Sequence, residues 1–368
     1  MFLTETKLKI AQKMMLATLA MTAVACDKGA GSFSVLSGNS QFQQSVSFTP
    51  RKLDVLFVVD NSGSMQTSQN NLANNFPAFI DKFVSKGYDF RIAVTTTDAY
   101  YGDQFTGSGC SICNTQHTKF FSGANPPVFV IDRADYDLSQ PSEAARLKSD
   151  FEANVKVGVV GSGDERAFSS FKAALSSSLN VNYHRADAFL AVVIVSDEDD
   201  FSQSQYAMNE SYSNPNAFSV ASYKTYLDGF TGGIAGEDYS VSAISVSDMT
   251  CRDQLGGGAG QGAQKISQRY NQLIDLTGGT KNSICNPFDQ TLDNISSQIM
   301  TESKPVFTLN KKPIIASIRV VVDGVTVPQN STDGWSYDAT ARTITINGAV
   351  YKPSAGSSIS INFDPDLT

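Results

Sequence analysis

The middle of the chain alternates between apolar runs typical of buried strands and stretches in which apolar residues recur with helical spacing. The pattern predicts strands at residues 53–59, 90–95, 189–195 and 239–246, and helices around residues 72–83, 165–179, 266–274 and 288–299. The runs 53–59 and 189–195 are nearly continuously apolar, as in strands covered on both faces. Pro77 lies inside the first helix and predicts a kink or a restart there. This alternation predicts an α/β fold with a doubly wound, mostly parallel sheet.

The pattern changes to a period of two near the end of the chain. Short apolar–polar alternations are separated by the turn signals Asp323-Gly324 and Asn347-Gly348. We predict an α/β domain over residues 51–304 and a small antiparallel β module over residues 305–368.

Two polar stretches interrupt the α/β domain, at about residues 98–150 and 198–217. We predict that they are insertions, because long loops in a compact domain are usually functional or ordered by local contacts.

Residues 1–25 have the pattern of an export signal. Lys7, Lys9 and Lys13 precede an uncharged, mostly apolar run at residues 14–25. A run of about a dozen residues is too short to cross a bilayer and has the length of the apolar region of a signal peptide. We therefore predict that the protein is exported.

The signal ends in Ala23-Val24-Ala25-Cys26. The two alanines fit an ordinary signal peptidase, but the segment also resembles a bacterial lipobox, whose cysteine is lipidated and becomes the first residue. The chain has five cysteines, and lipidation of Cys26 accounts for the odd one in an exported protein. We favour a lipid anchor at Cys26 over simple secretion, with a flexible tether over residues 26–50.

Composition is that of an ordinary globular protein, with 41% hydrophobic and 17% charged residues. The formal net charge is −8, and the sequence has no basic run. Because phosphate binding needs clustered lysine and arginine, we do not expect nucleic acid as a partner.

A group of oxygen-bearing side chains follows the predicted strands. Asp60, Ser62 and Ser64 come directly after residues 53–59, and Asp197 follows residues 189–195. Ligands of doubly wound sheets collect at the carboxyl ends of the strands, where the strand order reverses. Carboxylates and hydroxyls converging there would make an all-oxygen site, which suits Mg²⁺ or Ca²⁺.

The segment Asp60-Asn61-Ser62-Gly63-Ser64 is similar to the Asp-x-Ser-x-Ser motif of von Willebrand factor A (VWA) domains, which have a Rossmann-like fold. In that family the motif builds the metal-ion-dependent adhesion site (MIDAS), and the similarity in pattern covers roughly residues 50–303. It implies that Ser62 and Ser64 ligate Mg²⁺ directly, with Ca²⁺ or Mn²⁺ possible, and that Asp60 and Asp197 act mainly through bound waters. An Asp or Glu carboxylate of a partner protein would take the open coordination position.

Two features depart from the family pattern. The loop at residues 158–165 lacks the usual threonine ligand; Ser162 is the best replacement and Asp164 the second choice. Acidic residues 198–200 follow Asp197 where the family usually has glycine. We interpret the run from Asp197 to Asp200, taken alone, as a solvated acidic loop rather than a second metal site.

The remaining cysteines allow three pairings, of which we favour Cys110 with Cys113 and Cys251 with Cys285. The Cys110-x-x-Cys113 motif lies in a loop rich in Gly and Thr rather than at the start of a helix, which favours a structural disulfide over a redox centre. Zinc is not expected, because the chain has two histidines and oxidised cysteines do not ligate.

These observations favour a metal-dependent protein-binding or adhesion module that is not an enzyme. We expect it to be anchored through a lipid in the bacterial cell envelope, at the outer membrane or the periplasmic face of the inner membrane. One alternative is a structural envelope protein whose metal stabilises the fold. A metal-assisted hydrolase is disfavoured; it would need a general base such as Glu165 or Glu198 beside the ion.

Overall fold

The computed structural model describes residues 42–105, 115–256, 265–303, 305–348 and 350–367. The predicted signal peptide, the lipidation site Cys26 and the pair Cys110–Cys113 lie outside the described residues. No helix among the described residues is long and apolar enough to span a membrane.

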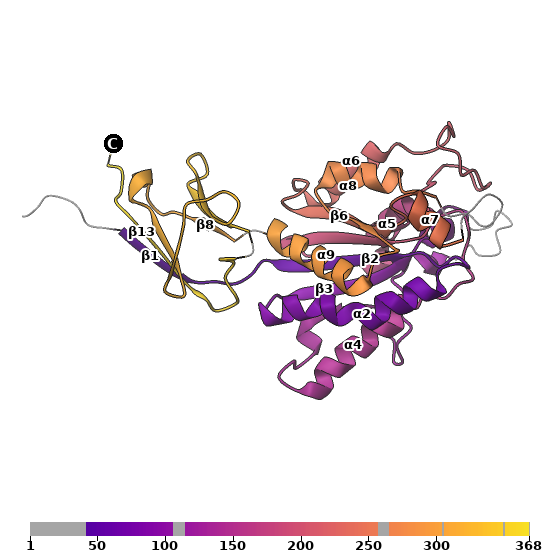
Figure 1. The fold of residues 1–368 in the computed structure, drawn as a ribbon, viewed down its shortest axis with the longest axis horizontal. Coiled ribbons are helices and arrows are strands. Elements are labelled where there is room, and N and C mark those ends of the chain that lie inside the picture. The colour runs from indigo at the N-terminus through magenta and orange to yellow at the C-terminus, as the bar shows by residue number, and fades with distance from the viewer. Residues whose placement is uncertain (1–41, 106–114, 257–264, 304, 349, 368) are drawn as a thin grey trace, which may run out of the picture. The chain divides into compact units, whose positions relative to one another are not determined.

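A six-stranded sheet forms the centre of the α/β domain (Figure 1). Its strands, in spatial order, are β4 (Val130–Asp132), β3 (Phe90–Thr96), β2 (Lys52–Val59), β5 (Ala188–Val195), β6 (Tyr239–Ser245) and β7 (Lys281–Ser283). All neighbours are parallel except β4, which runs antiparallel to β3. The prediction of a mostly parallel, doubly wound sheet is confirmed at this level. The strand order reverses at the pair β2–β5, so the carboxyl ends of these two strands mark the expected ligand-binding edge.

Helices cover both faces of this sheet (Figure 1). One face packs against α2 (Gln66–Ser85), α4 (Pro141–Val155), α7 (Met249–Gln254) and α9 (Phe288–Glu302). The other packs against α5 (Ala167–Ser176), α6 (Val220–Thr231) and α8 (Arg269–Thr277). Successive residues of β2 alternate between the two cores: Leu53, Val55, Phe57 and Val59 belong to one and Leu56 and Val58 to the other. This double burial explains the continuous apolar run in the sequence.

Helix α2 continues through Pro77 without a break, so the predicted restart is wrong. Proline removes one backbone donor, but Phe76, Phe79 and Phe83 are fully buried against the sheet around it. Burial of that face outweighs the lost hydrogen bond.

The described residues of the segment predicted as an insertion, 98–105 and 115–150, contribute to the α/β core. They include α3 (Ala99–Gln104), β4, α4 and the short 3₁₀ helices Thr115–Thr118 and Arg133–Asp135. Leu147, Phe151 and Val155 of α4 are buried in the same core as α2. Their four-residue spacing among polar residues makes a stripe too narrow to stand out in the sequence.

The β module contains two antiparallel sheets. Their strands are β1 (Phe42–Ser47), β13 (Ser358–Phe363), β9 (Arg319–Val322) and β10 (Val325–Val327) in one, and β11 (Gly334–Asp338), β12 (Thr343–Asn347) and β8 (Val306–Thr308) in the other. Trp335, the only tryptophan, is buried in the core of this module. At the predicted turn between β9 and β10, Asp323 and Gly324 have φ values of 48° and 83°, as a tight hairpin requires.

The first strand of the β module comes from the segment predicted to be a tether. β1 pairs with β13 along all six of its residues, so the tether prediction for residues 26–50 is wrong for residues 42–47. Without β1, the backbone groups on one side of β13 would form an unpaired sheet edge. The α/β domain is therefore inserted, in sequence, between two strands of the β module.

Candidate metal centre

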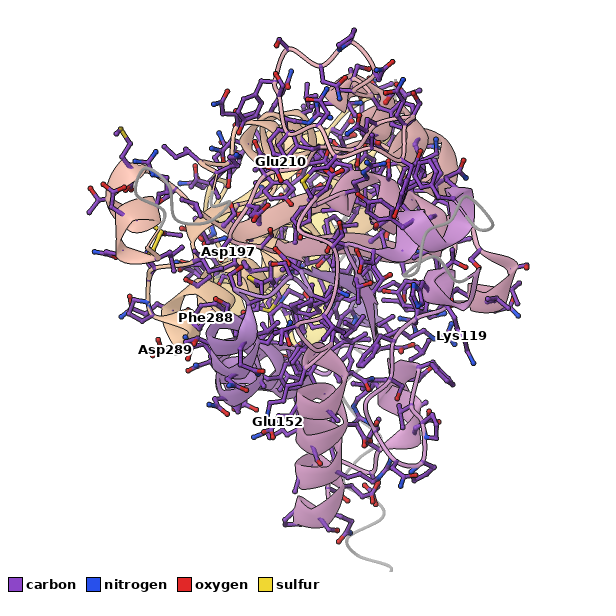
Figure 2. All side chains as sticks on the ribbon, turned by 90° about the vertical axis from the view of Figure 1, so that its right-hand side faces the viewer. Lys119, Glu152, Asp197, Glu210, Phe288 and Asp289 are labelled. Carbon is purple, nitrogen blue, oxygen red and sulfur yellow. A yellow bond between two sulfur atoms is a disulfide. The ribbon has the colours of Figure 1, made fainter. Side chains whose placement is uncertain are left out.

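Three neighbouring parallel strands end in an aspartate at the same edge of the sheet. Asp60 follows β2 directly, while Asp98 and Asp197 lie two residues beyond the ends of β3 and β5. Figure 2 views the protein from this end and labels Asp197. Asp60 and Asp197 are predicted site residues, whereas Asp98 is not, because the sequence after β3 contains no recognisable motif.

Ser62, Ser64 and Asp197 lie in contact. The hydroxyl oxygens of Ser62 and Ser64 are 3.2 Å apart, and the Ser64 hydroxyl donates to Asp197 Oδ1 at 3.0 Å. Ser64 is exposed to solvent, whereas Ser62 and Asp197 are buried. Two hydroxyls and one carboxylate thus converge at an edge that an ion can reach from outside.

Asp60 is fully buried beneath these hydroxyls. Its Oδ1 accepts a hydrogen bond from the Ser62 N–H and its Oδ2 accepts one from the Ser196 hydroxyl, both at 2.7 Å. Burial, together with repulsion from Asp197, raises the pKa of Asp60 from 3.8 to about 7. With a donor on each of its oxygens, Asp60 orients the Ser62 turn and places negative charge behind it.

The loop at residues 158–163 is tied to this motif. Gln69 donates to the carbonyl oxygens of Asp60 (2.9 Å) and Gly158 (2.7 Å), and the Gly161 N–H donates to Asn61 O at 2.8 Å. A Cβ atom at Gly161 would lie 2.5 Å from the Asn61 side chain. Glycine allows the two loops to approach this closely.

Ser162, the expected replacement for threonine, makes other contacts. Its N–H lies 3.2 Å from each carboxylate oxygen of Asp98, and its hydroxyl accepts from the Asp164 N–H at 3.1 Å. Within the described part of the chain it makes no hydrogen bond to Ser62 or Ser64. The hydrogen bonds of Ser162 thus tie it to Asp98 and Asp164, and its role as a metal ligand stays a prediction.

Asp164, the second choice, is partly committed to a buried ion pair. Its Oδ2 accepts from Arg166 Nη2 at 2.6 Å and from the Tyr101 hydroxyl at 2.9 Å. The Arg166 and Asp164 side chains are 0% and 1% exposed. Only Oδ1 of Asp164 accepts no hydrogen bond from the described residues.

Glu165 and Glu198, which could serve as general bases in the disfavoured hydrolase, are both buried at this edge. Glu165 is fully buried, and neither of its carboxylate oxygens has a hydrogen-bond partner among the described residues. Burial first, and then repulsion from Asp60 and Glu198, raises the pKa of Glu165 well above its usual range. The nearby Thr97 hydroxyl opposes this shift, but it donates to Asn61 Oδ1 at 3.3 Å.

Glu198 is in a similar position. It is 3% exposed, and its Oε2 has no partner in the described ranges. Burial and then repulsion from Asp60 raise the pKa of Glu198 to about 10. The edge of the sheet therefore concentrates carboxylates that local donors do not satisfy.

The prediction that Asp197 to Asp200 form a solvated acidic loop is wrong, because all four residues are buried. Asp199 accepts hydrogen bonds from the N–H groups of residues 268, 269 and 270 at the start of α8. Asp200 accepts from the Phe168 N–H at the start of α5 and from the Arg269 side chain. The first N–H groups of a helix lack partners within it, and these carboxylates supply them.

No three His, Cys, Asp or Glu side chains in the described ranges are grouped so that they could hold a metal ion by themselves. An ion at this edge would need the hydroxyl oxygens of Ser62 and Ser64 as well. Neutral hydroxyls combined with carboxylates form the hard oxygen donor set that Mg²⁺ and Ca²⁺ prefer. The residues present fit such an ion at the Ser62–Ser64–Asp197 contact.

A cavity of about 540 Å³ lies beside the motif. Asn61, Asp98 and Gly161 border it on the motif side, and it is lined further by Phe121, Phe129, Val157 and Val160. Lys119, labelled in Figure 2, lies 3.5 Å from the centre of the Phe129 ring. Val160 is 88% exposed. The cavity thus offers an apolar surface next to one cationic side chain.

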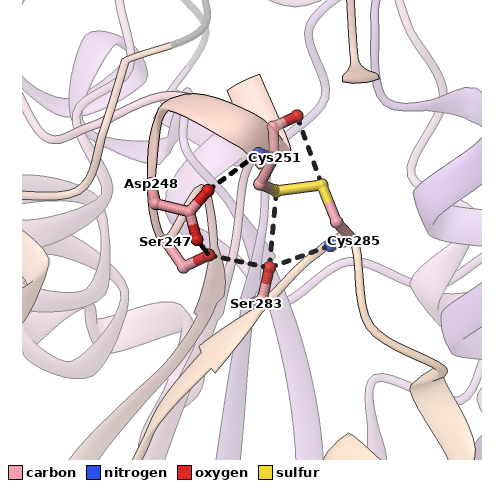
Figure 3. The surroundings of a disulfide bond; sticks show 5 residues. All are labelled: Ser247, Asp248, Cys251, Ser283 and Cys285. Carbon is pink, nitrogen blue, oxygen red and sulfur yellow. Dashed lines mark hydrogen bonds between the residues drawn. A yellow bond between two sulfur atoms is a disulfide. The ribbon is translucent and has the colours of Figure 1, made fainter. Parts of the chain in front are cut away.

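The predicted disulfide between Cys251 and Cys285 is present (Figure 3). It joins α7 to the segment before α9, and the Cys251 N–H donates to Asp248 Oδ1 at 2.9 Å. The bond ties together two segments that follow β6 and β7 at the ligand-binding edge.

No protein-family model and no curated protein matches the chain. Solved structures with a similar arrangement include the pilus adhesin SpaC from Lactobacillus rhamnosus GG, at 12% identity and a TM-score of 0.40 over 87% of this chain and 40% of that one. The pilus adhesin RrgA from Streptococcus pneumoniae gives 9% identity and a TM-score of 0.29 over 87% and 58% of the two chains. The adhesive tip pilin GBS104 from Group B Streptococcus agalactiae gives 11% and 0.33 over 89% and 83%. The chain spans about two-fifths of the SpaC chain, and scores this low carry no inference about function.

Proposed function

We propose that the carboxyl edge of the sheet is a divalent-cation site of the VWA type, through which an exported adhesion protein holds a carboxylate of a partner protein. The contact between Ser62, Ser64 and Asp197 carries this proposal. It lies where β2 and β5 meet and the strand order reverses, which is where doubly wound sheets bind their ligands.

Ser62 and Ser64 would hold the ion through neutral oxygens, while Asp60 supports them from the buried side. When bound, Mg²⁺ (or Ca²⁺ or Mn²⁺) supplies an electrophilic centre that attracts an Asp or Glu carboxylate. Because Ser64 is exposed, a partner side chain can approach from solvent. The adjoining cavity, with Val160 at its surface, would receive an apolar side chain next to that carboxylate.

The buried acids favour a second function, in which the ion stabilises the fold. Glu165 and Glu198 lie buried among other carboxylates without sufficient donors. A cation at this edge would reduce their mutual repulsion, and any ligand that binds only the folded state raises its stability. Binding a partner and stabilising the fold are separable, because a variant can fold with metal and still fail to bind.

Titration calorimetry with MgCl₂ on the full chain tests the cation site. Native protein should bind the ion, Asp60→Ala and Ser64→Ala should abolish binding, and Thr67→Ala should not. Thr67 is a matched control because it is an exposed hydroxyl residue one turn further along the chain. Circular dichroism of each variant checks the fold. Absence of binding to the native chain would refute the cation site.

A partner assay then distinguishes adhesion from stabilisation. A binder captures its carboxylate-bearing partner in Mg²⁺ and releases it in EDTA while remaining folded. Loss of the folded signal together with the partner would favour the structural alternative. Anchoring at Cys26 has its own test: Cys26→Ser should release the protein from the membrane fraction, and retention there would argue against lipidation.

A further inference from the structure

We infer that Glu165 provides the oxygen donor that a threonine provides in the family motif, so that the proposed ion is held by Ser62, Ser64, Asp197 and Glu165. The inference rests on the proposed cation site and concerns which residue of the 158–165 loop completes it.

The other two candidates in this loop are held elsewhere. The Ser162 hydroxyl accepts from the Asp164 N–H, and its backbone is tied to Asp98. Asp164 has one oxygen in a buried ion pair with Arg166, which also neutralises its charge. Moving either residue to the ion would break these contacts, and those of Asp164 are buried.

Glu165 has both oxygens available and is held in place by its backbone. Its carbonyl oxygen accepts a hydrogen bond from the Phe201 N–H at 2.7 Å. One residue, Arg166, separates Glu165 from the start of α5. Neither carboxylate oxygen has a partner in the part of the chain that the structure describes, although the residue is fully buried. A buried carboxylate without donors is unfavourable unless it takes up a proton or a cation compensates its charge.

Glu165 and the Asp60 side chain are on the same side of the sheet, the side covered by α5. Val58 and Ile194 pack in the core that contains α5, and residues two positions apart along a strand share a face. Asp60 and Ser196 continue those two rows and are joined by a hydrogen bond. Electrostatic repulsion couples Glu165 to both Asp60 and Glu198. Glu165 therefore belongs to the same buried acidic group as Asp60 and Glu198.

The neighbouring cations are committed to other acids. Arg166 pairs with Asp164, Arg269 with Asp200 and Lys265 with Glu210. Within the described ranges no ion pair includes Glu165. A divalent cation at the Ser62–Ser64–Asp197 contact would supply the missing positive charge. A carboxylate donor in place of a hydroxyl also adds one negative charge to the site and can bind through two oxygens, which suits Ca²⁺ better than Mg²⁺.

The test combines calorimetry with thermal unfolding of the full chain, using MgCl₂ and CaCl₂ separately. Glu165→Gln keeps the shape of the side chain and removes its charge. We expect it to weaken ion binding by roughly tenfold or more, as loss of a ligand or its support does at metal sites, and to weaken Ca²⁺ binding more than Mg²⁺ binding. Ser162→Ala should bind both ions as the native chain does.

Two further measurements separate ligation from general electrostatics. In EDTA, Glu165→Gln should melt at the same temperature as the native chain or higher, because the neutral amide replaces a buried acid that must otherwise stay protonated. Its rise in melting temperature on adding Ca²⁺ should be smaller than the native rise. Glu198→Gln is the matched control, since it removes a second buried acid of the same group; it should weaken ion binding less.

The outcomes are distinguishable. Native affinity in Glu165→Gln, or equal losses in Glu165→Gln and Glu198→Gln, would overturn the role of Glu165 while leaving the cation site intact. Loss of binding in Ser162→Ala would assign the position to Ser162 instead. Should the native chain bind neither ion, the cation site and this inference would both fall. A Glu165→Gln chain that does not fold would be replaced by Glu165→Thr, which restores the family's hydroxyl and should bind Mg²⁺.

Discussion

Replacing Asp60 by Asn should make the metal-free protein more stable at pH 8. Burial and Asp197 raise the pKa of Asp60 from 3.8 to about 7. Between these values the folded state keeps a proton that the unfolded state releases, so stability falls as the pH rises from about 4 to about 7. Above pH 7 the whole difference is lost, which amounts to about 4 kcal/mol at 1.36 kcal/mol per unit of pKa.

The gain from the substitution is smaller than this figure. The introduced asparagine would still accept from the Ser62 N–H, but its amide nitrogen cannot accept the hydroxyl proton that Ser196 now donates. Losing a hydrogen bond to a charged group removes about 1.5–3 kcal/mol. We therefore expect Asp60→Asn to stabilise the metal-free α/β domain by about 1–3 kcal/mol at pH 8. At pH 4 the variant should be no more stable than the native chain.

The structure provides an assay that separates the two parts of the chain. All α-helices of the described residues belong to the α/β domain, so circular dichroism at 222 nm follows its unfolding. Trp335 is the only tryptophan and lies in the core of the β module, so its fluorescence follows that module. In urea unfolding in EDTA at pH 4, 6 and 8, the midpoint of the 222 nm transition should change with pH, and the midpoint of the Trp335 fluorescence transition should not.

Two results would contradict this account of Asp60. Equal midpoints of the native 222 nm transition at pH 6 and pH 8 would mean that Asp60 does not titrate in this window. A lower midpoint for Asp60→Asn at pH 8 would mean that its hydrogen bonds outweigh its charge. In either case, relief of buried charge would not support the proposed cation site at this edge.

Three other perturbations have defined outcomes. Joint replacement of Cys251 and Cys285 by Ser opens a loop with a sequence separation of 34 and should lower the stability of the α/β domain by about 3–4 kcal/mol in urea unfolding; an unchanged midpoint would contradict it. Arg166→Leu leaves the buried Asp164 carboxylate without its ion-pair partner and should lower the stability of the α/β domain by about 3–5 kcal/mol in the same assay. A loss as small as that of a typical surface substitution would contradict a structural role for this ion pair. Val160→Asp should weaken partner binding about tenfold, equivalent to about 1.4 kcal/mol, while Ile234→Asp, at another exposed apolar position, should not; equal effects would remove the cavity from the binding surface.

Several elements of the fold could be predicted because their signal is local. The continuous apolar runs of β2 and β5 reflect burial on both faces, and the helical spacing in α9 reflects one buried stripe. Helix α4 was not predicted, because its buried apolar side chains are three residues spaced four positions apart among polar residues. Strand β1 escaped because its partner, β13, lies more than 300 residues further along the chain.

In the candidate site, too, some features follow from the local sequence and others depend on contacts between distant segments. Asp60 and Asp197 could be assigned to one edge from the sequence, because parallel strands align their carboxyl ends. The roles of Asp199 and Asp200 could not, since the N–H groups that they accept belong to helices about 70 and 30 residues away, a separation visible only in the folded chain.

The α/β class, the position of the motif after β2 and the antiparallel character of the β module all follow from the amino-acid pattern, because periodicity records which side of each element is buried. Which acids remain without donors depends instead on how distant segments pack. Glu165 and Asp164 are adjacent and chemically alike, yet Arg166 and Tyr101 compensate the charge of one and no described residue does so for the other. The charge that the site presents to an ion is the sum of those long-range contacts, and a local pattern of residues does not record it.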